Sequence, residues 1–215
     1  MLSESQVRKL LSPFDLSLSS DQVSKLNFYL ELLLTWNRRI NLTSVRTAEE
    51  CVTRHFGESL YLARWHTLSG RLLDVGTGAG FPGLALKISF PDLWATLLEP
   101  ITKKRAFLKE VARVCGFENV EIRPERLEDY CRTSTQARFD HASARAVGHI
   151  LSLARNMAVC LKDGGRIYLW LTTGDKTAVS TTTPEVNWDA PHEIPLSHKR
   201  QILCGVVHKN LGKAG

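Results

Sequence analysis

The residues best suited to chemistry form one glycine-rich stretch, Asp74-Val75-Gly76-Thr77-Gly78-Ala79-Gly80-Phe81-Pro82-Gly83. It overlaps a short apolar run, residues 72–75, that is typical of a buried strand, and it precedes an apolar helical run. Glycines at such a turn let the backbone approach a ligand closely, and a helix that begins there offers free N–H groups. The stretch therefore predicts a ligand site between a strand and a helix.

Spacing alone leaves more than one interpretation of this turn open. Gly78, Gly80 and Gly83 match the G-x-G-x-x-G spacing of dinucleotide sites, which would indicate an NAD(P) oxidoreductase. Asp74, Gly76 and Gly78 instead match an acid followed by G-x-G, the turn of S-adenosylmethionine-dependent methyltransferases. A carboxylate at Asp74 would oppose a pyrophosphate and suit a cationic ligand. A turn with a purely structural role is the third interpretation.

Glu99 is a second acidic residue of interest, because it follows the apolar run 94–98. A carboxylate at the end of the second strand can accept hydrogen bonds from both hydroxyls of a ribose. Glu99 therefore predicts a nucleoside ligand, and it fits an NAD site and an adenosylmethionine site equally well.

The elements that must position these residues alternate along the chain from residue 71 onward. We expect strands at 72–75, 94–98, 120–122, 139–143, 167–171 and 202–207, and helices at 84–88, 103–114 and 150–161. A turn is expected at 163–165, and the polar residues 172–195 are expected to form a loop. Alternation of this kind predicts an α/β fold with a mostly parallel sheet and a ligand at the carboxyl ends of the strands.

The first 66 residues show helical periodicity and no strand pattern. Ser20 and Asp21 are suitable N-caps for a helix that ends near residues 36–37. Thr47, with Glu50 three residues later, predicts the start of a second helix that runs to residue 60. We therefore expect a helical N-terminal extension, residues 1–66, and a Rossmann-like domain, residues 67–215.

Composition excludes several classes of protein. The 215 residues are 43% hydrophobic and 23% charged, which excludes a collagen, a chain disordered throughout and a disulfide miniprotein. The five cysteines lack C-x-x-C spacing, so we expect free thiols and no metal site. No apolar run is long enough for a membrane span, and the N-terminus lacks a signal-peptide pattern, so we expect a cytoplasmic protein. The net charge of +6 permits an anionic partner without requiring one.

Three further motifs carry a resemblance to a known family. They are Trp36-Asn37-Arg38-Arg39-Ile40-Asn41-Leu42-Thr43, Arg54-His55-Phe56-Gly57-Glu58-Ser59-Leu60 and Lys104-Arg105-Ala106-Phe107-Leu108. Together with the glycine-rich stretch, they make residues 20–171 resemble the bacterial 16S rRNA guanine-N7 methyltransferases, also called glucose-inhibited division protein B. The first two motifs are more specific than the glycines.

The resemblance implies a class I methyltransferase fold, S-adenosylmethionine as methyl donor and 16S rRNA of the small ribosomal subunit as acceptor. It implies cofactor contacts at Gly76, Phe81, Leu127, Glu128 and Arg145, to which the strand-end geometry adds Gly78 and Glu99. The substrate-binding residues that we expect beside them are Asn41, Arg54, His55, Lys104 and Arg105. We expect a pre-ribosomal particle to be a better acceptor than naked RNA, because the positive charge is modest.

The implied chemistry needs few catalytic groups. Guanine N7 has a free lone pair and no proton, so its methylation requires no general base, and none is predicted. Two stretches depart from the family pattern: Glu58-Ser59 replaces the usual Asp-Ser, and Leu171-Thr172-Thr173-Gly174 stands where a Lys-Gly pair is usual. The second departure leaves open a methyltransferase with another acceptor and an RNA-binding module without activity.

Overall fold

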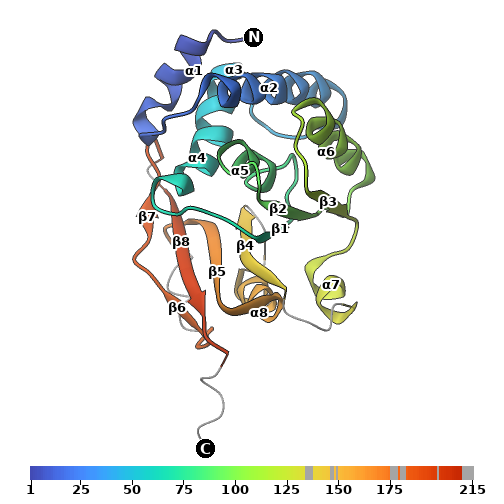
Figure 1. Cartoon of the computed structure of the whole chain (residues 1–215), viewed down its shortest axis with the longest axis vertical. Coiled ribbons are helices and arrows are strands. Elements are labelled where there is room, and N and C mark those ends of the chain that lie inside the picture. The colour runs from blue at the N-terminus through green and yellow to red at the C-terminus, as the bar shows by residue number, and fades with distance from the viewer. Residues whose placement is uncertain are drawn as a thin grey trace, which may run out of the picture.

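The computed structural model describes residues 1–133, 138–145, 148, 150–174, 179, 183–197 and 199–209. Within these ranges, an eight-stranded sheet has the order β3-β2-β1-β4-β5-β8-β6, and β7 pairs with β8 (Figure 1). Strands β1 to β5 pair with one another in parallel, whereas β8 is antiparallel to β5 and to β6. The expected mostly parallel α/β sheet is therefore present.

The strands are β1 (Arg71–Val75), β2 (Trp94–Leu98), β3 (Val120–Arg123), β4 (Phe139–Arg145), β5 (Leu161–Thr172), β6 (Val186–Trp188), β7 (His192–Glu193) and β8 (Arg200–Val207). All six expected strands lie within these bounds. The expectation of a loop throughout residues 172–195 is wrong where β6 and β7 occur. Strands of two or three residues are too short to show alternation, and they form because β8 offers a pairing edge. The turn expected at 163–165 is absorbed into the irregular start of β5.

The helices of the extension are α1 (Glu4–Leu11), η1 (Ser12–Phe14), α2 (Ser20–Ile40), α3 (Ala48–Cys51), η2 (Val52–Gly57), α4 (Glu58–Leu60) and η3 (Tyr61–Arg64). The expected single helix from Thr47 to residue 60 is therefore interrupted by η2, a π-helical turn. The Phe14 ring packs 2.5 Å from where a Cβ on Gly57 would lie, so this turn must be free of a side chain there. The cap at Thr47 is confirmed, because its side chain accepts the Glu50 N–H.

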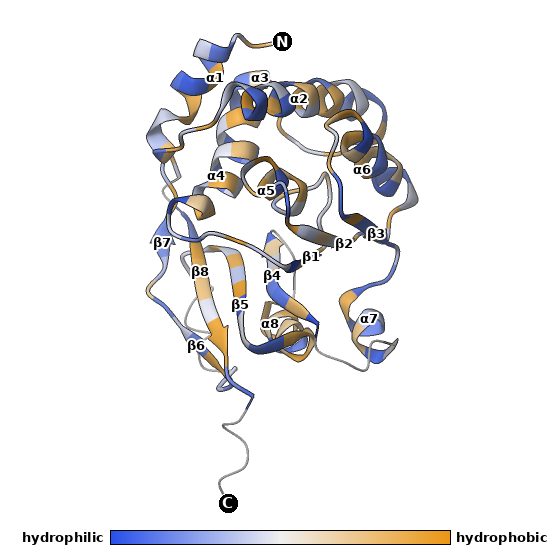
Figure 2. Cartoon of the chain, in the orientation of Figure 1, coloured by the Kyte–Doolittle hydropathy of each residue, from blue (hydrophilic) through white to orange (hydrophobic). Residues whose placement is uncertain are grey.

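The remaining helices are α5 (Gly83–Ser89), α6 (Thr102–Val114), α7 (Leu127–Thr133) and α8 (Ile150–Cys160). They divide between the two faces of the sheet. Leu72 and Leu97 face α5, α6 and the extension, whereas Leu73 and Leu98 face α7 and α8, so each face has its own apolar core. Figure 2 shows hydrophobic residues on the helices as well as on the central strands. Because the extension shares one of these cores with the sheet, it is packed as part of one molecule; the domain boundary at residue 66 stays a prediction.

Two features are absent from the described ranges, a membrane-spanning helix and a metal-binding cluster. No helix among these residues combines the length and apolar character needed to cross a membrane. No three His, Cys, Asp or Glu side chains of the same residues lie together in a way that could hold a metal ion.

Candidate active site

A pocket of about 270 Å³ lies at the carboxyl edge of the sheet, where β1 and β2 end and α7 and α8 begin. It is lined by Val75, Gly76, Leu98, Pro100, Glu125, Arg126, Leu127, Glu128, Gly148, Ser152 and Leu153. Apolar side chains form its walls, and carboxylates and a hydroxyl stand among them. Three of the expected cofactor residues, Gly76, Leu127 and Glu128, lie in this pocket. Apolar walls with a few polar groups suit a nucleoside with a flat base.

The glycine-rich loop that borders the pocket is built from left-handed backbone. Gly76, Gly78 and Gly80 have φ angles of 65°, 59° and 91°, which residues with a side chain rarely adopt. The Gly78 N–H donates to a carboxylate oxygen of Glu99 at 3.1 Å. The loop therefore depends on glycine for its shape and on Glu99 for its orientation.

The match of Gly80 and Gly83 to a dinucleotide motif has a structural explanation. A Cβ on Gly80 would lie 2.1 Å from the Tyr29 hydroxyl, and a Cβ on Gly83 would lie 2.5 Å from an Asp74 oxygen. The Gly83 N–H donates to Asp74 rather than facing outward. These two glycines make room for packing within the protein, so their spacing does not favour an NAD(P) site.

Asp74 is fully buried beneath the loop. One carboxylate oxygen accepts the Gly83 N–H at 2.9 Å, and the other accepts the Ser143 hydroxyl at 2.6 Å. Burial raises the pKa of Asp74 from 3.8 to about 6, although the hydrogen bonds from Ser143 and Gly83 oppose the shift. The expectation that Asp74 faces a cationic ligand is therefore wrong: its carboxylate joins β1 and β4 to the start of α5.

Glu99 organises backbone beside the pocket. It is 3% exposed, and its second oxygen accepts the Ile101 N–H at 2.8 Å. Its neighbours Leu98 and Pro100 line the pocket, whereas Glu99 is not part of the lining. Arg105, which we expected to bind substrate, donates to the carbonyl oxygens of Glu99 at 3.0 Å and of Pro100 at 2.5 Å. The structure thus assigns Arg105 to holding the loop that follows β2.

Phe81 points away from the pocket into the helical extension. Its ring is 7% exposed and stacks between Tyr29, at a centroid distance of 5.3 Å, and His55, at 4.8 Å. Phe56 meets it edge-on at 5.1 Å. A direct cofactor contact by the Phe81 ring is therefore not supported; the ring anchors the loop to the extension.

Arg145, at the end of β4, also binds the extension rather than lining the pocket. Its guanidinium donates to Glu58 at 2.9 Å, to the Arg54 carbonyl at 2.5 Å and, at longer range, to the Ser59 hydroxyl and the His55 carbonyl. Burial lowers the pKa of Arg145 to about 10, which leaves it protonated at neutral pH. The departure at Glu58-Ser59 thus preserves an acid and a hydroxyl that both meet this arginine.

The other expected substrate residues differ in how accessible they are. His55 bonds the Thr43 hydroxyl at 2.7 Å, and burial, together with Arg145 and Arg54, lowers its pKa to about 3. It is therefore neutral at physiological pH and does not serve as an acid. Asn41 and Arg54 are exposed and Lys104 is half-buried, so these three can meet a large ligand.

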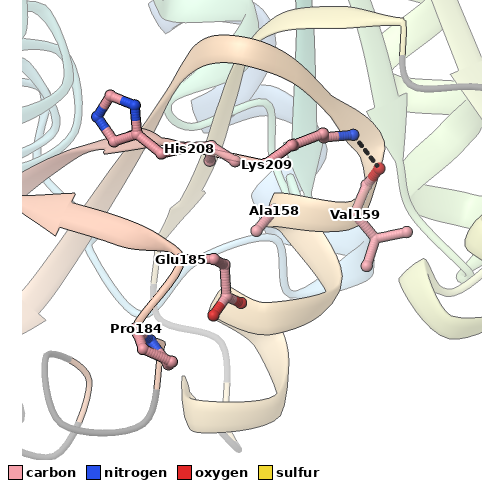
Figure 3. Close-up of a pocket in the computed structure, with 7 residues that line it drawn as sticks. Ala158, Val159, Pro184, Glu185, His208 and Lys209 are labelled. Atoms are coloured by element: carbon pink, nitrogen blue, oxygen red, sulfur yellow. Dashed lines mark hydrogen bonds between the residues drawn. The ribbon is translucent and has the colours of Figure 1, made fainter. Parts of the chain in front are cut away.

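A larger cavity, of about 550 Å³, lies at the opposite edge of the sheet. The ends of α8 and β8 form it with Pro184 and Glu185, and a hydrogen bond of 3.3 Å joins the Lys209 ammonium to the Val159 carbonyl (Figure 3). It contains none of the expected site residues. The smaller pocket at the carboxyl edge is therefore the candidate active site.

The sequence of this chain is similar to those of known proteins. Residues 22–201 match the GidB family model, described as rRNA small subunit methyltransferase G. The chain belongs to this family. The Chloroflexus aggregans relative is 39% identical over 152 residues, which cover 70% of this chain and 64% of that protein, slightly less than two thirds of its length. The Syntrophotalea carbinolica relative is 33% identical over 202 residues, which cover 94% and 93%. Both are named ribosomal RNA small subunit methyltransferase G.

Solved structures show that this GidB-family chain has the class I methyltransferase fold. TrmN from Thermus thermophilus has a TM-score of 0.58 at 15% identity over 73% of this chain and 53% of its own. The TYW2 protein of Pyrococcus horikoshii, solved in complex with MeSAdo, has a TM-score of 0.58 at 14% identity over 71% and 62%. A ribosomal protein L11 methylase from Lactobacillus delbrueckii has a TM-score of 0.57 at 15% identity over 71% and 79%.

Sequence reasoning missed several residues of the GidB-family pocket. Val75 and Leu98 end their strands, and Ser152 and Leu153 open α8, so strand ends and helix starts were the available signals. It also missed Asn37, whose side chain binds Thr43 and the Val45 carbonyl and so fixes the turn after α2. Ala146, which follows Arg145 in the family motif, lies outside the described residues.

Proposed function

We propose that this protein transfers a methyl group from S-adenosylmethionine to N7 of a guanine in 16S rRNA of the small ribosomal subunit. The observation that carries the proposal is the pocket at the carboxyl edge, bordered by the left-handed glycine loop, in a chain of the GidB family. The match of relatives to most of the chain supports it.

The residues of the pocket fit adenosylmethionine. Leu98, Pro100 and Leu127 offer an apolar slot for the adenine, and Gly76 lets the backbone come close to the ligand. Glu128 offers a carboxylate at the rim of the same pocket. When bound, adenosylmethionine supplies an electrophilic methyl group on a sulfonium.

The protein's part in the reaction is to position the two partners. Guanine N7 needs no base to remove a proton, which agrees with the burial of His55 as a neutral ring. Holding N7 in line with the methyl group would lower the barrier through orientation, for which about 7–11 kcal/mol is available in well-oriented reactions.

Exposed cations around the extension support an RNA substrate. Arg38, Arg39, Arg46, Arg54 and Lys103 are exposed, and each would contribute salt-sensitive affinity on meeting a phosphate. Asn41 and Lys104 belong to the same proposed surface. Because the net charge is only +6, the acceptor is a pre-ribosomal particle rather than naked RNA.

The test is transfer of labelled methyl from adenosylmethionine to small ribosomal subunits that lack the modification, followed by nucleoside analysis. Label in 7-methylguanosine of 16S rRNA is the expected result, and particles should accept it better than naked 16S rRNA. Absence of label with adenosylmethionine still bound in a parallel titration would point to another acceptor. Absence of both the label and adenosylmethionine binding would mean that this chain has the methyltransferase fold without methyltransferase activity.

A further inference from the structure

Tyr29, on α2 of the helical extension, lies directly beneath the glycine-rich loop. Its side chain is fully buried, and its hydroxyl donates to the Ala79 carbonyl at 2.5 Å. Its ring stacks on Phe81 at a centroid distance of 5.3 Å and an angle of 10°. The hydroxyl also occupies the space that a Cβ on Gly80 would need. Three consecutive residues of the loop therefore take their positions from this one side chain.

The loop is held from a second side by η2. His55 stacks on the other face of Phe81, at an angle of 21°, and the Thr43 hydroxyl fixes the His55 ring. Phe56 packs edge-on against both Tyr29 and Phe81, each at 5.1 Å. The Phe81 ring thus sits in an aromatic slot that is formed entirely by the extension.

This hold reaches the pocket through the short turn of the loop. The N–H groups of Gly80 and Phe81 both donate to the Thr77 carbonyl, at 2.8 and 3.0 Å. Thr77 lies between Gly76, which lines the pocket, and Gly78, whose N–H meets Glu99. A shift of residues 79–81 would therefore displace the backbone that borders the pocket.

We propose that Tyr29 is a positioning residue of the methyltransferase: it sets the glycine-rich loop so that the pocket accepts adenosylmethionine. The proposal rests on the proposed function, because it assigns the pocket to that cofactor. Burial raises the pKa of Tyr29 well above 10, so the hydroxyl keeps its proton and remains a donor. The helical extension is, on this proposal, part of the cofactor site although none of its residues lines the pocket.

The test compares Tyr29→Phe with Tyr168→Phe by titration calorimetry with adenosylmethionine. Tyr168 is an equally buried tyrosine, on β5, whose hydroxyl lies 3.4 Å from His141, so both variants lose one buried hydroxyl. For Tyr29→Phe we expect the Kd to rise about five- to tenfold, the range that loss of one buried hydrogen bond gives. The kcat at saturating cofactor should stay within about twofold of wild type. For Tyr168→Phe we expect an unchanged Kd.

The outcomes separate the inference from the proposed function. Adenosylmethionine binding by wild type with an unchanged Kd in folded Tyr29→Phe would overturn the role of Tyr29 alone. Failure of wild type to bind adenosylmethionine would overturn the proposed function, and the inference with it. If circular dichroism shows that Tyr29→Phe is unfolded, Phe81→Leu decides, because it removes the stack and stays apolar. A raised Kd in that variant supports the inference, and an unchanged Kd overturns it.

Discussion

The Glu58 carboxylate meets the Arg145 guanidinium at 2.9 Å, at the point where the helical extension contacts the end of β4. Glu58 is 2% exposed, and its other oxygen lies 2.5 Å from Arg200 on β8. The Trp170 indole N–H donates to the Glu58 carbonyl as well. The Glu58 carboxylate therefore holds β4 and β8 against the extension, and the Glu58 backbone carbonyl holds β5.

Replacing this acid should be costly. In Glu58→Gln, Arg145 would remain buried without its counterion, and we expect the free energy of unfolding to fall by about 3 kcal/mol in urea titrations. Glu110→Gln, which breaks an exposed pair with Arg113 on one helix, is the matched control and should change little. Equal effects of the two substitutions would contradict the assigned role of Glu58.

The buried Asp74 predicts a pH dependence of stability. Because its folded pKa of about 6 lies above the unfolded value of 3.8, the folded state binds the extra proton between these values. The stability of wild type relative to Asp74→Asn should therefore fall as the pH rises from about 4 to about 6, by about 3 kcal/mol in total, and stay level above that. Asparagine is a suitable reference, since its oxygen can accept from Gly83 while its amide donates to the Ser143 hydroxyl. Parallel stability curves for the two proteins would refute the burial of an ionisable Asp74.

His55 should act in the opposite sense. Its folded pKa of about 3 lies below the ordinary 6.5, so the unfolded chain binds the extra proton between these values. Stability contributed by the neutral ring is lost as the pH falls below about 6.5, and His55→Gln should remove that loss. The pH dependence of kcat between about 6 and 8 should be the same in both proteins, because the His55 ring stays neutral throughout this range. A kcat profile that changes shape in the variant would show that His55 titrates during turnover.

Two left-handed glycines allow a matched test of the loop. Gly78 and Gly116 have φ angles of 59° and 62°, and a Cβ would find room at either position. Alanine at each should cost about 1 kcal/mol of stability from backbone strain. Only Gly78→Ala should also weaken adenosylmethionine binding, because strain at this position would shift the backbone N–H that meets Glu99 beside the pocket. Calorimetric titration of both variants gives the comparison, and equal Kd values would remove Gly78 from the site.

Lys104 and Arg105 are neighbours for which the structure predicts different defects. Lys104→Ala should leave adenosylmethionine binding intact and reduce the salt dependence of rRNA binding by about one unit of log–log slope. Arg105→Ala should raise the Kd for adenosylmethionine, because it releases the carbonyls of Glu99 and Pro100. Filter binding over a salt series and calorimetry measure the two effects. The same defect in both variants would contradict this division.

The parts of the fold that sequence could predict are those set by local pattern. The strands at 72–75 and 94–98, the turn between strand and helix and the cap at Thr47 all follow from spacing within a few residues. The roles of Asp74 and Arg145 could not follow in this way, because Ser143 lies 69 residues from Asp74 and Glu58 lies 87 residues from Arg145. The sequence pattern indicated that both residues lie at the carboxyl edge of the sheet, but it could not show which way their side chains point.

The family resemblance named some residues that line the pocket and others whose side chains point elsewhere. Gly76, Leu127 and Glu128 lie in the pocket because they sit at strand and helix ends, where position alone is informative. Phe81 belongs to the same motif but faces Tyr29, which is 52 residues earlier in the chain. The π-helical turn η2 breaks the regular periodicity that a sequence-based prediction depends on.

The shared carboxylate of Glu58 also sets an order of events during synthesis. The extension is synthesised before the sheet, but the two partners of its buried acid, Arg145 and Arg200, follow Glu58 by 87 and 142 residues. Until β8 has been synthesised, burial of the ionised Glu58 carboxylate is unfavourable, because only part of its set of charged partners is present. The apolar packing of the extension against α5 and α6 needs no residue of β8, whereas the ion pairs of Glu58 are completed only when Arg200 has been made.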